Sequence, residues 1–131
     1  MRNSRRPVAR IRIAWSDGAI TVELRDTPTA KAVLAALPCQ ASASTWGEEV
    51  YFELPVTAVL EPDAQQVVDP GTVCFWVEGS ALALPYGRTP VSKGNESRLV
   101  TRCNVVGKVV GEARQLRGIE DGAALRLEAI A

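Results

Sequence analysis

Apolar and polar residues alternate along several short stretches of this chain, which is the pattern of strands that bury one face. Residues 10–15 and 20–24 alternate in this way, and Ser16, Asp17 and Gly18 lie between them. Aspartate followed by glycine between two alternating runs is typical of a β-hairpin whose turn residues take positive φ angles. The pattern therefore predicts that the fold opens with a hairpin.

The next segment has the spacing of a helix. Thr27 can cap the first turn, Pro28 suits the first helical position, and apolar residues follow at spacings of three, one and three up to Leu37. Pro38 should end this helix. A helix of about three turns can plug one end of a barrel, but it is too short to build a bundle.

The stretch T-W-G-E-E-V-Y-F-E-L over residues 45–54 predicts a strand with two unlike faces. Alternation sends the apolar side chains at positions 50, 52 and 54 to the core, and Glu49 and Tyr51 to the other face. With Trp46 at the entrance of the strand, this second face is a candidate pocket wall.

Several further elements are expected along the chain. We expect a loop at residues 40–44, strands at 57–60, 72–77, 99–102 and 104–110, and a mobile loop at 92–97. A last alternating strand with Leu125, Leu127 and Ala129 should follow the turn at Asp121 and Gly122. Pro70 and Gly71 have the chemistry of a type II turn, Gly107 suits a close backbone approach, and Gly118 should end a short helix at 112–117. Short strands, frequent turn signals and two short helices predict an all-β sandwich or barrel.

Charge and composition narrow the range of partners. Lys plus Arg number 15 and Asp plus Glu number 15, so no net charge attracts nucleic acid or an anionic membrane, and we expect neither as a partner. The one basic cluster falls in residues 1–10, which we interpret as a flexible basic arm before a domain at 11–131. No apolar stretch suits a signal peptide or a membrane span, so a cytoplasmic location is expected.

The cysteines and the lack of histidine limit the possible chemistry. Cys39, Cys74 and Cys103 are widely spaced and form no C-x-x-C pair, so buried or half-buried free thiols are expected rather than disulfides or a zinc site. Histidine is absent, which removes His-activated nucleophiles and the commonest metal-ligand sets. We expect no cofactor and no metal.

The order of motifs resembles that of the cyclophilins. G-A-I-T-V-E-L-R-D-T-P-T-A-K-A-V-L-A-A-L at residues 18–37 looks like their opening strand and first helix, and V-V-G-K-V-V-G-E-A-R-Q-L-R-G-I at 105–119 resembles their late strand and final helix. Between these ends, T-W-G-E-E-V-Y-F, V-V-D-P-G, Y-G-R-T-P and N-V-V-G are similar to a small bacterial and archaeal cyclophilin-like family. The resemblance implies a closed barrel of about eight strands capped by helices.

The resemblance to the peptidyl-prolyl isomerases of this fold does not extend to their site. Those enzymes use an arginine within an F-H-R run to stabilise a twisted amide, and the matching region here has Glu48, Glu49 and Val50. The small family's usual Trp-Pro-Pro-Gly also reads Trp76-Val77-Glu78-Gly79 in this chain. We therefore expect no active isomerase.

The candidate site comprises eight polar and aromatic residues, each with a second interpretation. Of the two adjacent glutamates at least one should face solvent, the aromatic residues could belong to the core, the arginine could be a solvated loop charge, and the asparagine could satisfy backbone groups. The eight are Trp46, Glu48, Glu49, Tyr51, Trp76, Tyr86, Arg88 and Asn104.

The leading functional hypothesis is a barrel that binds a small-molecule or peptide-like ligand without isomerase activity. One alternative is a peptidyl-prolyl isomerase with an atypical site that uses Arg88 or Arg102. The other is a protein-interaction module that docks to an enzyme or to a second copy of itself.

Overall fold

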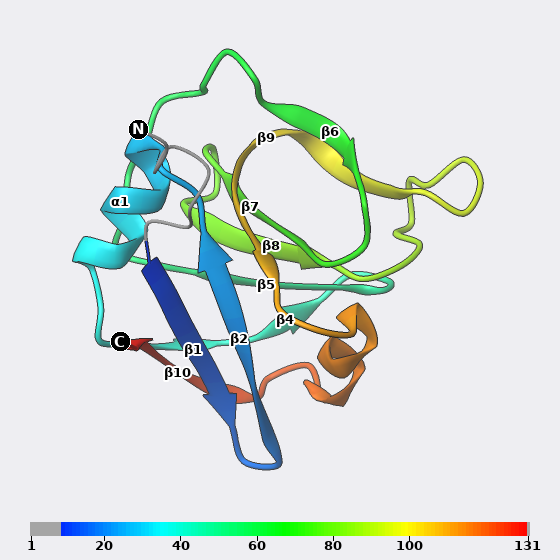
Figure 1. The fold of residues 1–131 in the computed structure, drawn as a ribbon. Coiled ribbons are helices and arrows are strands. Elements are labelled where there is room, and N and C mark those ends of the chain that lie inside the picture. Colours follow the sequence, from blue (N-terminus) through cyan, green and yellow to red (C-terminus); the bar gives the residue numbers. More distant parts are fainter. Residues whose placement is uncertain (1–8, 131) are drawn as a thin grey trace.

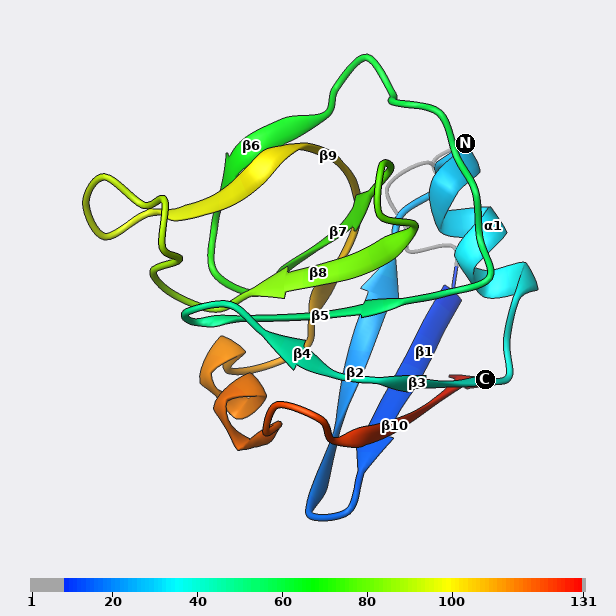
Figure 2. The same ribbon diagram turned by 180° about the vertical axis from the view of Figure 1, so that it is seen from behind.

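The computed structural model describes residues 9–130, which form a ten-stranded, nearly closed barrel-shaped sheet with two short helices (Figures 1 and 2). The strands are β1 (Ala9–Trp15), β2 (Gly18–Leu24), β3 (Cys39–Ser42), β4 (Ser44–Thr45), β5 (Glu49–Glu53), β6 (Gln65–Val68), β7 (Thr72–Trp76), β8 (Ala81–Pro85), β9 (Ser97–Val109) and β10 (Ala124–Ile130). The helices are α1 (Pro28–Ala35) and the 3₁₀ helix η2 (Ala113–Gly118). Neither described helix has the length and apolar character that a membrane span requires.

The barrel is nearly closed because the two end strands of the sheet are neighbours in the chain. The strand order is β3-β10-β1-β2-β9-β7-β8-β5-β4, and β6 pairs with β9 off this path. Only Ala43 separates β3 from β4, and its amide donates a hydrogen bond to the carbonyl of Ala123 at 2.8 Å. The two end strands of the sheet, β3 and β4, are therefore parts of one short continuous segment of the chain.

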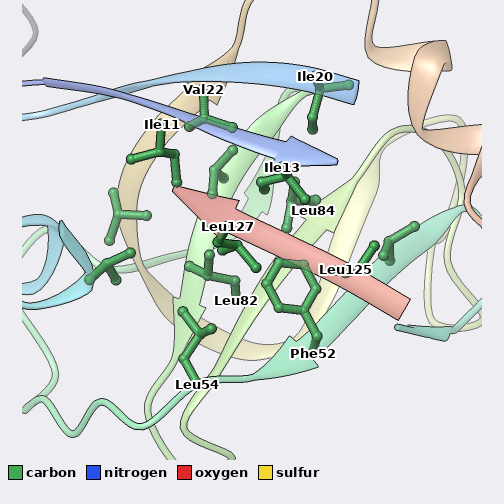
Figure 3. Close-up of a cluster of buried hydrophobic side chains, with 14 of the residues drawn as sticks. Ile11, Ile13, Ile20, Val22, Phe52, Leu54, Leu82, Leu84, Leu125 and Leu127 are labelled. Atoms are coloured by element: carbon green, nitrogen blue, oxygen red, sulfur yellow. The ribbon is translucent and has the colours of Figure 1, made fainter. Parts of the chain in front are cut away.

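The inside of the barrel is filled by the apolar face of each strand. Ile11, Val22, Phe52, Leu82 and Leu127 are all buried and come from five different strands (Figure 3). Helix α1 buries Ala30 and Val33 against the same core, and the Thr27 side chain accepts the amide of Ala30 at 3.1 Å. The predicted all-β class, the alternating faces and the capped first helix are thus confirmed.

The opening hairpin is confirmed, but its turn differs from the prediction. Trp15 is opposite Gly18 in the register of β1 and β2, and neither Asp17 nor Gly18 has a positive φ. A Cβ atom on Gly18 would lie 2.9 Å from the Trp15 ring. Glycine is therefore needed here because the Trp15 ring leaves no space for a side chain, and not because the turn is left-handed.

Two other glycines behave as predicted. The Thr72 amide donates to the carbonyl of Asp69 at 3.1 Å, and Gly71 has φ +92°, which is the geometry of a type II turn. A Cβ atom on Gly107 would lie 2.2 Å from the carbonyl oxygen of Glu23. Because β2 and β9 approach closely at this point, no side chain fits there.

The predictions for two segments are wrong. Residues 40–42 and 44 are strand and not loop, because β3 pairs through its main chain with β10 and β4 pairs with β5, which small polar side chains do not prevent. Residues 57–60 form no strand, and Val59 is 81% exposed.

The predicted helix at 112–117 is the 3₁₀ helix η2. Of the predicted basic arm, residues 1–8 lie outside the described residues, while Ala9 and Arg10 belong to β1.

The break predicted near Cys103 is instead a change of partner within one long strand. The first part of β9 pairs with β6 up to Cys103, and Asn104 begins its pairing with β7. From Gly107 the strand also pairs with β2. Figure 2 shows β6 and the first half of β9 curving away from β7 and β8.

A buried polar network lies where β9 changes partner. The Asn104 side chain is fully buried, and its Nδ2 donates to Thr29 Oγ1 at 2.9 Å and to the carbonyl of Val59 at 2.8 Å. Its Oδ1 accepts the amide of Glu61 at 2.8 Å. The Glu61 carboxylate in turn accepts both the amide and the hydroxyl of Thr29. The network joins β9, the first turn of α1 and the irregular segment at residues 55–63.

We expect Asn104→Ala to lower the free energy of unfolding by about 3 kcal/mol, because it leaves several buried groups without hydrogen-bond partners. The exposed loop residue Asn95 provides the control, and Asn95→Ala should cost less than about 0.5 kcal/mol. Urea denaturation of both variants measures the difference. Equal stability of the two variants would contradict the role given to this network.

Candidate functional site

A cavity lies on the outer face of the barrel wall formed by β5, β8 and β7. While Phe52, Leu82 and Phe75 point into the core, the intervening residues of these strands point outward. In one row across this outer face, Ala83 lies between Tyr51 and Cys74. Because Ala83 is small, the row is hollow at its centre.

The opposite wall comes from the first half of β9, which leaves the barrel to pair with β6. Between the two walls is a cavity of about 180 Å³. It is lined by Trp46, Glu49, Tyr51, Trp76, Ala83, Leu99, Val100 and Cys103. Three aromatic side chains and one carboxyl group are thus combined with an otherwise apolar lining, a composition typical of small-molecule sites.

Glu49 is the unusual residue of this cavity. Its side chain is only 5% exposed, and its buried Oε1 has no hydrogen-bond partner among residues 9–130. It takes no part in the ion pairs of the described chain. Burial therefore raises the pKa of this carboxyl group to about 7. Near neutral pH, Glu49 exchanges between a neutral acid and a carboxylate.

The two cysteines near Glu49 are protonated thiols. All three cysteines are free, as predicted, and Cys74 and Cys103 are buried. Burial, and then the nearby Glu49 charge, raise the pKa of Cys103 to about 12, and burial is also the main cause of the raised pKa of Cys74. Because the thiolate is the reactive form of cysteine, these thiols are poor nucleophiles.

The structure brings four of the eight predicted site residues together at the cavity, namely Trp46, Glu49, Tyr51 and Trp76. Glu48 lies elsewhere, in the turn before β5. Its Oε1 accepts a hydrogen bond from the backbone amide of Arg88 at 3.0 Å, and its Oε2 accepts one from Nη2 of Arg117 at 2.9 Å. These hydrogen bonds lower the pKa of the Glu48 carboxyl group. Through them, Glu48 connects the start of β5 to the loop after β8 and to the helix η2.

The other three predicted residues also lie outside the cavity lining. Tyr86 is half-buried against the barrel core, and the Arg88 side chain is exposed in the loop after β8. Asn104 belongs to the buried network with Thr29 and Glu61, so its amide satisfies backbone and side-chain groups inside the fold.

Sequence reasoning missed four lining residues: Ala83, Leu99, Val100 and Cys103. Ala83 had a detectable signal, because alanine and leucine alternate from Ala81 to Leu84 and the small residues fall on the outer face. The three residues of β9 had none, since they reach the cavity only because β9 bends away from β7. Among residues 9–130, no group of three or more His, Cys, Asp or Glu side chains is placed to hold a metal ion.

The chain is similar to a known protein family and to a solved archaeal structure. The family model described as Cyclophilin-like matches residues 9–128. The solution structure of the hypothetical protein AF2241 from Archaeoglobus fulgidus is similar, with 32% sequence identity and a TM-score of 0.81. That likeness covers 96% of this chain and 98% of the archaeal one. No curated protein matches the sequence.

The raised pKa of Glu49 has a consequence for stability. The folded state favours the protonated carboxyl, so this stabilisation is fully present below the ordinary pKa of 4.5 and is lost as the pH rises to about 7. We expect the free energy of unfolding of the wild type to fall by on the order of 3 kcal/mol more than that of Glu49→Gln across this range.

Urea denaturation at a series of pH values measures this difference, with the exposed Glu112 as the control position. Glu112→Gln should follow the wild type at every pH. Parallel curves for the wild type and Glu49→Gln would show that Glu49 titrates as an ordinary surface carboxylate.

Proposed function

The chain belongs to the Cyclophilin-like family, and from that premise we propose that its barrel binds a small or peptide-like ligand in the outer-face cavity without peptidyl-prolyl isomerase activity. The observation that carries this proposal is the buried Glu49 carboxyl, which has an unpaired oxygen and lies in a cavity with three aromatic side chains. A buried polar atom without a partner costs free energy, so a ligand that supplies the missing hydrogen bond is favoured.

The size of the cavity limits the part of a ligand that it holds. An engineered apolar cavity of about 150 Å³ binds benzene, so about 180 Å³ holds a group slightly larger than one aromatic ring. A small metabolite or a single side chain of a peptide fits this space. The rings of Trp46, Tyr51 and Trp76 can bury the apolar surface of such a group.

The charges around the cavity argue against isomerase chemistry. Twisting the prolyl amide meets a barrier of roughly 18–20 kcal/mol, which a positioned donor lowers by favouring the twisted state. No arginine lines the cavity in the described chain, where Glu49 has the opposite charge. Arg88 and Arg102 are both exposed, and the Arg102 Nε donates to the carbonyl of Ala64 at 3.4 Å.

We expect members of a panel of small metabolites and short peptides to raise the melting temperature of the wild type. Ligand at about 100 times its Kd adds about 2.7 kcal/mol of stability, which a thermal-shift assay detects easily. Trp76→Ala should fold but lose this stabilisation, because Trp76 forms part of the cavity wall. Trp15→Phe, outside the cavity, is the control and should retain it. A panel without any stabilising compound would count against the proposal.

We also expect the protein to leave the cis–trans exchange rate of a short Ala-Pro peptide unchanged. Exchange spectroscopy by NMR measures this rate, while the amide shifts of labelled protein report binding at the same time. Accelerated exchange would instead support an isomerase with an atypical site, and Arg88→Ala and Arg102→Ala would then be compared.

A further inference from the structure

We propose that the ligand of this cavity is a compact organic ammonium ion, with an apolar body of about the size of one ring. This inference rests on the proposed binding function and specifies the chemical class of the ligand. Its basis is the combination of an unpaired buried carboxyl, a lining without basic residues and three aromatic side chains.

In the described chain, the buried Glu49 carboxyl lacks a hydrogen-bond donor at one of its oxygens. Glu49 is only 5% exposed, and its Oε1 receives no hydrogen bond within the described residues. Carboxylates on buried strands are normally paired with donors or cations. A ligand N–H group supplies the donor, and a protonated amine also supplies the compensating charge.

The described lining of the cavity carries no positive charge. None of the side chains that line the cavity is lysine or arginine. A neighbouring hollow of about 600 Å³ shares Tyr51 and Trp76 with the cavity, contains Glu53, and has no basic residue in its described lining. On β9, the Arg98 Nε is 3.0 Å from the Glu96 carboxylate. The site therefore attracts a cation and repels a carboxylate or phosphate.

Aromatic side chains form much of the cavity wall. Trp46, Tyr51 and Trp76 contribute three aromatic rings to a cavity that also holds a carboxyl group. Aromatic faces carry negative potential and attract ammonium groups, most strongly where water is excluded. The same rings cover an apolar body, so charge and size act together to select the ligand.

The protonation of Glu49 should then control binding. Its pKa of about 7 means that the carboxylate form, which pairs with an ammonium ion, prevails only above neutral pH. The titratable groups that face it are the protonated thiols of Cys74 on β7 and Cys103 on β9, together with the Tyr51 hydroxyl on its own strand. From β8, the facing residues Ala83 and Pro85 carry no charge.

Three probes of nearly equal shape test the proposal: benzylammonium, benzyl alcohol and benzoate. Their affinities are measured by NMR titration of the tryptophan indole N–H signals of the full chain. At about pH 8 we expect benzylammonium to bind at least about tenfold more tightly than benzyl alcohol, and benzoate to bind most weakly. Below the pKa of Glu49, the affinity for benzylammonium should fall by up to about tenfold per pH unit.

Variants separate charge recognition from cavity filling. Glu49→Gln should weaken benzylammonium binding by about tenfold or more and change benzyl alcohol binding by less than about threefold. The control Glu112→Gln should change neither. Benzyl alcohol or benzoate binding as tightly as benzylammonium would overturn the ammonium class while leaving a ligand-binding cavity. If none of the three probes binds at the cavity, this inference fails, while the thermal-shift panel of metabolites and peptides decides the proposed function separately.

Discussion

The fold depends on the hydrogen bonds of the Asn104 side-chain amide at the point where β9 leaves the barrel. Up to Cys103 the strand pairs with β6, and from Asn104 it pairs with β7, so the chain must bend at a buried position. The Asn104 side chain satisfies a carbonyl and an amide of the irregular segment at residues 55–63, together with the Thr29 hydroxyl of α1. By supporting the bend, this one side chain also supports the second wall of the cavity.

The cavity and the barrel core are two faces of the same strands. Val50 and Phe52 contribute to the core, while Glu49 and Tyr51 of the same strand face the cavity. A buried carboxyl without a partner is unfavourable for folding, and natural proteins tend to break such local rules at functional sites. The well-packed core of the same wall is what allows β5 to hold Glu49 in place despite this cost.

The parts of the fold that depend on local rules were predictable from the sequence. Alternation identified the core faces, Thr27 and Pro28 the start of α1, and Gly107 a close approach of two strands. The strands β3 and β4 were missed because main-chain pairing with β10 and β5, rather than apolar side chains, defines them.

The site was predictable only in part, for a related reason. Glu49 and Tyr51 lie on an outward face that alternation identifies, Trp46 was expected at the entrance of that strand, and the structure brings these residues together with Trp76. The contribution of Leu99 and Cys103 depends on the path of β9 in three dimensions. The roles of Glu48 and Asn104 depend on hydrogen bonds to residues about 40 or more positions away in the chain, which spacing alone does not reveal.

The short segments that close the barrel also affect how this protein meets other chains. A long, flat, unpaired strand edge is a template on which a neighbouring chain can add a strand and begin to aggregate. In the described sheet the terminal strands β3 and β4 have four and two residues, and the pairing of the four-residue β6 is interrupted by a register shift. Edges this short and irregular offer an incoming strand few consecutive hydrogen bonds, a geometry that disfavours edge-to-edge pairing between copies of the chain.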